Sequence, residues 1–197
     1  MFYVLNDIEN PSIDEDEYDD PPFLEVHEEL LVNPDGGWHS GKKLAKPPEN
    51  IIQVQATPLF GYEGAPPDYY DDSISLISPR LKNILLDVGV DNVEFFPVHI
   101  TYRDRKESYD WFAFNIVGLS HSLIDNDKAH TNENGKGLID SSINGFSIDE
   151  HESKGLKIFR LSDNVMTTVV TQEVKDAVDS AGINTFAFTK PEDWIMV

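Results

Sequence analysis

The stretch ISPRLKNILLDVGVDNVEFFPV, residues 77–98, combines the signals of a strand end, a capped helix, a glycine stop and a second strand. Ser78 is a natural N-cap, and Pro79 fits the first helical position, where no backbone amide is needed. Gly89 suits the left-handed residue that ends a helix. The stretch therefore predicts a short helix between two strands, with its apolar face at helical spacing. That face is formed by Leu81, Ile84, Leu85 and Val88.

The same pattern returns in VTQEVKDAVDSAGINTFAFTKP, residues 170–191, which begins 93 positions after residue 77. Thr171 takes the N-cap position and Gly182 the stop. Two copies are too few for a repeat array, so we predict a duplication within one domain. Convergence of two ordinary strand–helix–strand units is the alternative. Lys82 and Lys175, at matching positions of the two copies, are expected to face solvent.

Five short motifs, four of them within the two copies, follow one another along the chain. They are Ile77-Ser78-x-x-Leu81-Lys82, Gly89-Val90, Val93-Glu94-Phe95-x-Pro97-Val98, Ile158-Phe159-Arg160-Leu161 and Val170-Thr171-x-Glu173-Val174-Lys175. In this order they resemble the bacterial polymorphic-toxin immunity protein family eleven, a Myxococcus-type immunity domain first described as a domain of unknown function. The likeness spans about residues 56–194, with a short N-terminal strand like residues 1–6. The likeness depends on the order and spacing of the motifs, because no single motif contains residues with a distinctive chemistry.

The resemblance implies an immunity protein that binds and neutralises a cognate secreted toxin domain encoded beside it. The setting would be contact-dependent or type VI-type competition between bacteria. The resemblance transfers no catalytic residues, so the chain is expected not to be an enzyme. No cofactor and no metal are predicted. An uncharacterised acidic hydrolase or an adaptor protein is the alternative.

The charge balance is the most pronounced feature of the composition. The chain has 36 acidic and 15 basic residues, a formal net charge of −21. Such a field repels nucleic acids and anionic membranes and attracts basic partners, so a basic toxin domain is the expected partner. The alternative is that the charge only keeps the protein soluble.

The compartment predicted for the chain is the cytoplasm. The absence of cysteine is compatible with a reducing compartment. The opening MFYVLNDIEN lacks the basic and apolar regions of a signal peptide, and no apolar run is long enough to span a bilayer.

Two acidic, proline-containing segments are the predicted partner-binding surfaces. Residues 11–22, PSIDEDEYDDPP, would steer a basic partner, whereas residues 61–72, GYEGAPPDYYDD, combine acids with tyrosines that give a large contact area. Ordinary solvated loops are the alternative for both. The predicted partner-binding residues are Asp14, Glu15, Asp16, Glu17, Asp19, Asp20, Asp68, Tyr69, Tyr70, Asp71 and Asp72.

The remaining segments predict an α+β fold, a largely antiparallel sheet with a few short helices. Residues 1–57 are expected to form an N-terminal β and irregular portion with the acidic loop, and residues 58–197 the immunity-type core, together one compact unit. Strands are predicted at residues 2–5, 51–55 and 109–119, and a hairpin with its turn at residues 162–164. The aromatic residues of the 109–119 strand are expected in the core rather than in a ligand cage. They are Trp111, Phe112 and Phe114.

Chemical motifs are weak throughout the chain. Its six histidines have no metal-binding spacing, and residues 135–137, Gly-Lys-Gly, lack the phosphate-loop spacing. His121, Ser122 and Asp125 invite a catalytic triad, but no nucleophile-elbow motif accompanies them. A hydrolase would need a pocket that joins a histidine to carboxylates.

Overall fold

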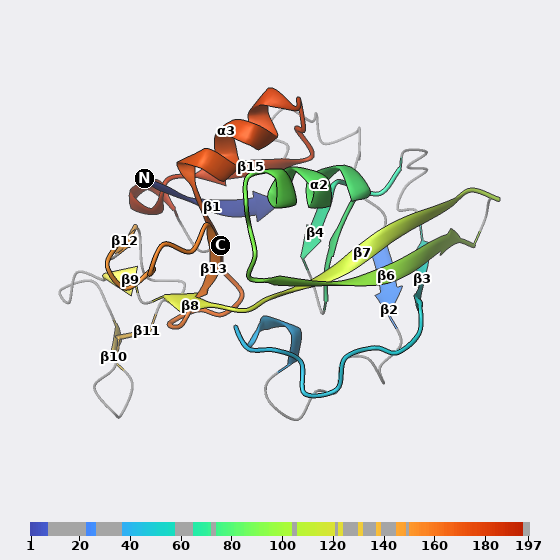
Figure 1. Ribbon diagram of the computed structural model, residues 1–197, viewed down its shortest axis with the longest axis horizontal. Coiled ribbons are helices and arrows are strands. Elements are labelled where there is room, and N and C mark those ends of the chain that lie inside the picture. The colour runs from blue at the N-terminus through green and yellow to red at the C-terminus, as the bar shows by residue number, and fades with distance from the viewer. Residues whose placement is uncertain are drawn as a thin grey trace.

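The computed structural model describes residues 1–7, 23–26, 37–57, 65–71, 74–103, 106–120, 122–123, 130–131, 137–138, 145–148 and 150–194. Within these residues the chain folds into two mixed β-sheets, two short strand pairs and two α-helices. Figure 1 shows the two helices side by side above the sheets. The predicted α+β class is therefore confirmed.

The six-stranded sheet has the order β2-β3-β6-β7-β5-β4, and the five-stranded sheet β15-β1-β14-β13-β8. Both are mainly antiparallel, and the parallel pairings are β3 with β6 and β8 with β13. The smaller pairs are β10-β11 and β9-β12. The strands are β1 Phe2–Asp7, β2 Phe23–Val26, β3 Ile52–Thr57, β4 Tyr69–Asp71, β5 Ser75–Ile77, β6 Val93–Tyr102, β7 Ser108–Ile116, β8 Leu119–Ser120, β9 Ser122–Leu123, β10 His130–Thr131, β11 Gly137–Leu138, β12 Ser147–Ile148, β13 Ile158–Leu161, β14 Thr168–Thr171 and β15 Phe186–Thr189.

The helices are α2 Pro79–Asp87 and α3 Gln172–Ser180, with 3-10 turns η1 Gly37–His39 and η2 Pro191–Asp193. Ser78 caps α2 by accepting a hydrogen bond from the Leu81 amide. Gly89 and Gly182 follow the helices with φ angles of 78° and 67°, the left-handed conformation that glycine adopts without strain. Both predicted helices and both predicted stops are confirmed.

The repeat found in the sequence is also present in the sheets. A first unit, β4-β5-α2-β6 with β7, contributes the strand order β4-β5-β7-β6, and a second unit, β13-β14-α3-β15 with β1, contributes β13-β14-β1-β15. The strand registers of the two units coincide pair by pair. Each pair of the first unit has a counterpart in the second. Tyr69–Ile77 matches Ile158–Val170, Ile77–Phe112 matches Val170–Tyr3, Leu76–Ala113 matches Val169–Val4, and Phe95–Phe114 matches Phe188–Leu5.

The matching lysines of the two helices correct one expectation. Lys82 lies over the Phe112 ring at 3.6 Å from its centroid, and Lys175 lies 5.4 Å from the ring centroids of both Tyr3 and Phe188. Neither lysine simply faces solvent, because each ammonium is drawn to the electron-rich ring faces of the strands beneath its helix. Phe112 and Tyr3 are equivalent in the two units, so the same cation–π contact occurs twice.

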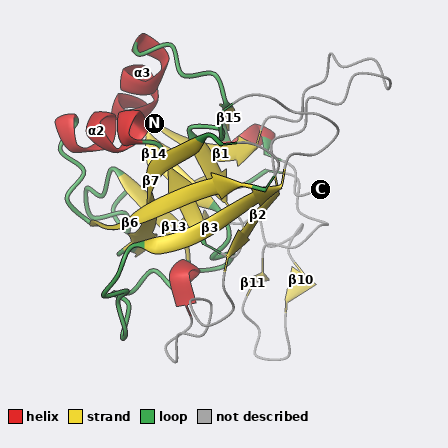
Figure 2. Cartoon of the chain, turned by 90° about the vertical axis from the view of Figure 1, so that its right-hand side faces the viewer, coloured by secondary structure: helices red, strands yellow, loops and turns green. Residues whose placement is uncertain are grey.

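The described residues form three apolar layers in the interior. The central one lies under both helices and takes side chains from both units, including Ile77 and Val170. The alternating side chains of the same strands, such as Leu76 and Val169, enter two outer layers. Figure 2 shows the helices at one side of the sheets. The two units are thus packed into one body through a shared core.

The predicted aromatic core of the 109–119 strand largely holds. Trp111 and Phe114 are buried, and Phe112 is half-buried under Lys82. The hairpin predicted with its turn at residues 162–164 is formed by β13 and β14, but its connection is longer and spans residues 162–167. Strand β1 pairs with β14 and β15, and β3 pairs with β6, so residues 1–57 contribute to both sheets. The boundary between residues 57 and 58 stays a prediction.

The two helix caps provide a matched test of the local signals. Ser78→Ala is expected to lower the free energy of unfolding by about 1–2 kcal/mol, because the Leu81 amide loses its partner. Among the described residues, the equivalent Thr171 makes no side-chain cap bond and its buried hydroxyl has no partner, so Thr171→Ala is expected to change stability by less than about 0.5 kcal/mol. Urea unfolding of both variants measures the difference; equal losses would contradict it.

Candidate functional site

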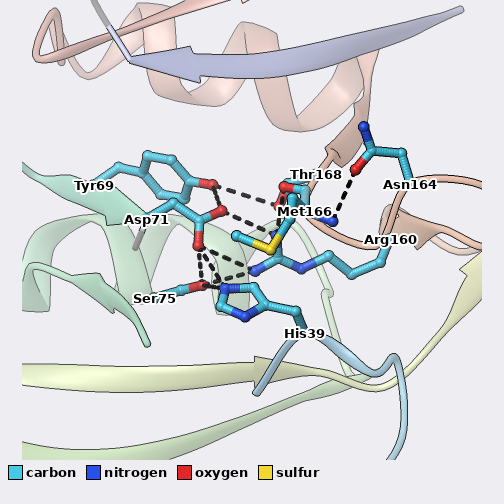
Figure 3. Close-up of polar contacts among 8 residues, drawn as sticks. All are labelled: His39, Tyr69, Asp71, Ser75, Arg160, Asn164, Met166 and Thr168. Atoms are coloured by element: carbon cyan, nitrogen blue, oxygen red, sulfur yellow. Dashed lines mark hydrogen bonds and ion pairs between the residues drawn. The ribbon is translucent and has the colours of Figure 1, made fainter. Parts of the chain in front are cut away.

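Charged and polar side chains gather at one end of the interior between the two units. Asp71 ends β4, Ser75 begins β5, Arg160 lies within β13 and Thr168 begins β14. Figure 3 shows that these side chains point toward one another. They share the strand faces that carry the central apolar layer, because Tyr69 and Ile77 lie two residues from Asp71 and Ser75. The group is therefore the polar end of the shared core.

The centre of this group is an ion pair between Arg160 and Asp71. The guanidinium is fully buried, and only 11% of the Asp71 side chain is exposed. Arg160 Nη1 donates to Asp71 Oδ2 at 2.9 Å and to the Met166 carbonyl oxygen at 2.9 Å. Arg160 Nη2 donates to Ser75 Oγ at 2.7 Å, while Arg160 Nε has no partner in the part of the chain that the structure describes. The cation is thus held by both units.

The Asp71 carboxylate accepts further hydrogen bonds. The Tyr69 hydroxyl donates to Oδ2 at 2.6 Å, and the Ser75 hydroxyl donates to Oδ1. His39 Nε2 lies 3.1 Å from Oδ1, and its ring comes from η1, outside both units. With Arg160, four side chains surround this one carboxylate.

These partners determine the protonation of Asp71 and Tyr69. Burial alone would raise the pKa of Asp71, but the Arg160 charge and the hydrogen bonds from His39 and Arg160 hold that pKa well below its ordinary value. Burial, with the neighbouring Asp71 charge, raises the pKa of Tyr69 well above its ordinary value. The carboxylate is therefore ionised and the phenol protonated near neutral pH.

The duplication explains where the two charges lie. Asp71 pairs with Ser75 across β4 and β5, and Arg160 pairs with Thr168 across β13 and β14. Since the registers of the two hairpins coincide, Asp71 and Arg160 occupy the same strand position in the two units. One position of the repeat has an acid in the first unit and a base in the second, and the two side chains meet across the interface.

The geometry favours a structural role over catalysis for this group. Ser75 is fully buried and its hydroxyl is engaged by Asp71 and Arg160, so it is not presented to a substrate. A small cavity lies nearby in the central layer, but its lining is apolar apart from Tyr69. In the described part of the chain, no three histidine or acidic side chains are grouped to hold a metal ion. No helix there has the length and apolarity needed to cross a membrane.

The predicted partner-binding residues divide into two sets. Asp14, Glu15, Asp16, Glu17, Asp19, Asp20 and Asp72 lie outside the described residues, as does His121 of the rival hydrolase interpretation. The other four lie in or beside β4. Their partner-binding role stays a prediction. They are Asp68, Tyr69, Tyr70 and Asp71.

The four described residues already have interactions within the chain. Tyr69 is buried and Asp71 is paired with Arg160. The Asp68 carboxylate accepts from the Ser78 hydroxyl, and the Asp68 amide donates to Thr185 Oγ1 at 2.9 Å. Tyr70 packs against the outer apolar layer of the six-stranded sheet. A toxin that engaged the Asp68 or Asp71 carboxylate would compete with these internal bonds.

Sequence reasoning missed His39, Ser75 and Arg160 in this group. One signal was available for Arg160: it interrupts an apolar strand, Ile158–Leu161, in which all four residues are buried. A charge at such a position requires an opposite charge nearby. Nothing local indicated that the partner would be Asp71, which is 89 positions away at the end of a short strand.

Loss of the buried carboxylate is expected to destabilise the fold strongly. Asp71→Asn leaves the Arg160 charge without its counter-ion, so the free energy of unfolding should fall by about 3–5 kcal/mol. Asp110→Asn is the matched control, because the Asp110 side chain is 90% exposed and its loss should cost less than about 0.5 kcal/mol. Urea unfolding checks both values. Similar losses for the two variants would mean that Asp71 contributes no more than a surface charge.

The Asp71 pKa also predicts the direction of an acid effect. Because the folded-state pKa is depressed, the stabilisation by Asp71 is present above the unfolded-state pKa of about 3.9 and is lost as the pH falls below it. Wild-type protein should therefore lose stability more steeply than Asp71→Asn between about pH 4 and pH 2. Unfolding midpoints measured across this range test the difference, and parallel profiles would contradict it.

Comparison with known proteins agrees with the motif order described above. The model of an immunity protein family, Imm11, matches residues 9–193. A search of the curated proteins gives no match. The family match includes β4 to β15 and the Arg160–Asp71 pair, and it omits the whole of β1. Because the match covers most of its length, the chain belongs to the immunity protein family Imm11.

Proposed function

We propose that this protein binds a cognate secreted toxin domain and neutralises it by stoichiometric association in the cytoplasm. The observation that carries the proposal is the immunity-family match over residues 9–193. The setting is competition between bacteria, contact-dependent or type VI-type, in which a cell must resist the toxin that it encodes. No chemical step by the immunity protein is needed for this role.

The charge of the chain supports a basic partner. A net charge of −21 gives a field that accelerates encounters with cationic proteins and disfavours nucleic acids. We propose that residues 14–20 carry most of this steering, since six of these seven residues are acidic. Residues 68–72 have a secondary part, because the Asp68 and Asp71 carboxylates already accept bonds within the chain.

The test uses the toxin domain encoded next to this chain. The six acidic residues of 14–20 are replaced by lysine, and association is measured by stopped flow at several salt concentrations. We expect the association rate constant at low salt to fall by about tenfold or more, with a weaker salt dependence. Protection of cells that express the toxin should weaken in parallel.

A matched control changes the net charge equally at exposed acids elsewhere. If the association rate constant falls only in the 14–20 variant, that segment steers the partner. If it falls equally in both variants, the overall charge of the chain is responsible for the steering. Failure of the wild-type chain to bind or protect against the toxin would overturn the proposed function itself. The control replaces Asp87, Asp91, Glu107, Glu150, Glu152 and Asp193 by lysine.

A further inference from the structure

The central strands of the two units are attached to the chain in different ways. In the first unit β7 follows β6 directly, with residues 103–107 between them. In the second unit the equivalent place between β14 and β15 is taken by β1, the first strand of the chain. Strand β15 leads into η2 instead. The second unit is therefore completed by a strand from the opposite end of the sequence.

The place of β1 is defined by non-covalent contacts with the second unit. Its backbone pairs with β14 over residues 2–4 and with β15 over residues 4–7. Tyr3 enters the central layer and its hydroxyl donates to Gln172 Oε1 at 2.7 Å, while Val4 enters the outer layer. Beyond them, Asn6 Nδ2 donates to Thr189 Oγ1 at 2.7 Å, and Trp194 Nε1 donates to Asn6 Oδ1 at 3.1 Å.

We propose that the slot between β14 and β15 also accepts β1 from a second copy of this chain, which gives a strand-exchanged dimer. Each slot recognises β1 through backbone register and side-chain contacts, and none of these contacts depends on which chain supplies the strand. Exchange therefore preserves the contacts of β1, and protein concentration shifts the balance toward the dimer.

The connection to the rest of the chain allows the exchange. Strand β1 is joined to β2 by residues 8–22. Fifteen residues span at most about 50 Å when fully extended, which is more than the diameter of a small domain. Strand β7, in contrast, is joined by short connections, to β6 by residues 103–107 and to β8 by residues 117–118. It cannot leave its sheet alone.

Cysteine trapping in the full chain tests this proposal, since the natural sequence contains no cysteine. Val4 and Val169 are buried partners across β1 and β14, at a cross-strand spacing that suits a disulfide. The single variants Val4→Cys and Val169→Cys are mixed, incubated at high concentration and oxidised. Non-reducing electrophoresis and mass spectrometry then detect a disulfide between residue 4 of one chain and residue 169 of another.

The equivalent pair in the first unit is the control. Leu76 and Ala113 are the counterparts of Val169 and Val4, and both are fully buried. A mixture of Leu76→Cys and Ala113→Cys measures interchain bonds that arise from general unfolding or collision. The corresponding double variants, each with both cysteines in one chain, show that either pair closes a disulfide within the monomer.

The expected result is an interchain 4–169 disulfide at least several-fold more abundant than the 76–113 bond, with a yield that rises with protein concentration. Equal yields in the two mixtures would overturn the proposal, because opening would then be global. Absence of the 4–169 interchain bond, while the double variant closes internally, would also overturn it. Neither result depends on toxin binding.

Discussion

The buried pair of Arg160 and Asp71 is the constraint around which the two units are arranged. Removing two charges from water costs several kcal/mol for each ion, and only close geometry with further hydrogen bonds compensates for that cost. Here Tyr69, Ser75 and the Met166 carbonyl supply those bonds. Apolar side chains on the neighbouring positions tolerate small displacements, whereas this charge pair fixes which strand positions of the two units meet.

Local signals were sufficient for the parts of the fold that depend on few neighbouring residues. Ser78, Pro79 and Gly89 define a helix within one segment, and the same pattern returns with Gly182. The two copies were recognisable because caps, stops and apolar spacing recur in sequence. The two copies are then equivalent in space, because the same sequence pattern gives the same strand register in both units. The lysine of each helix also contacts an aromatic ring on a strand beneath it, Lys82 on Phe112 and Lys175 on Tyr3.

The site depends on long-range pairing, which no local pattern contains. The acids, tyrosines and prolines of residues 61–72 are typical of a surface segment, whether a partner-binding surface or an ordinary loop. Tyr69 and Asp71 instead form β4, whose face points into the interior. The decisive fact is that β13 brings Arg160 to the same place. His39 contacts the carboxylate from a segment that belongs to neither unit of the repeat. Its place in the site therefore could not be predicted from the repeat or from the spacing of charges.

Under the proposed function, such an interior would hold the binding surface in one shape before a toxin domain binds, so that little ordering entropy is lost on binding. A double-mutant cycle on Asp71→Asn and Arg160→Met tests the central pair most directly. The two residues share one hydrogen-bonded pair, so the coupling free energy of unfolding should be about 2–3 kcal/mol. Additive losses, with coupling below about 0.5 kcal/mol, would contradict the account.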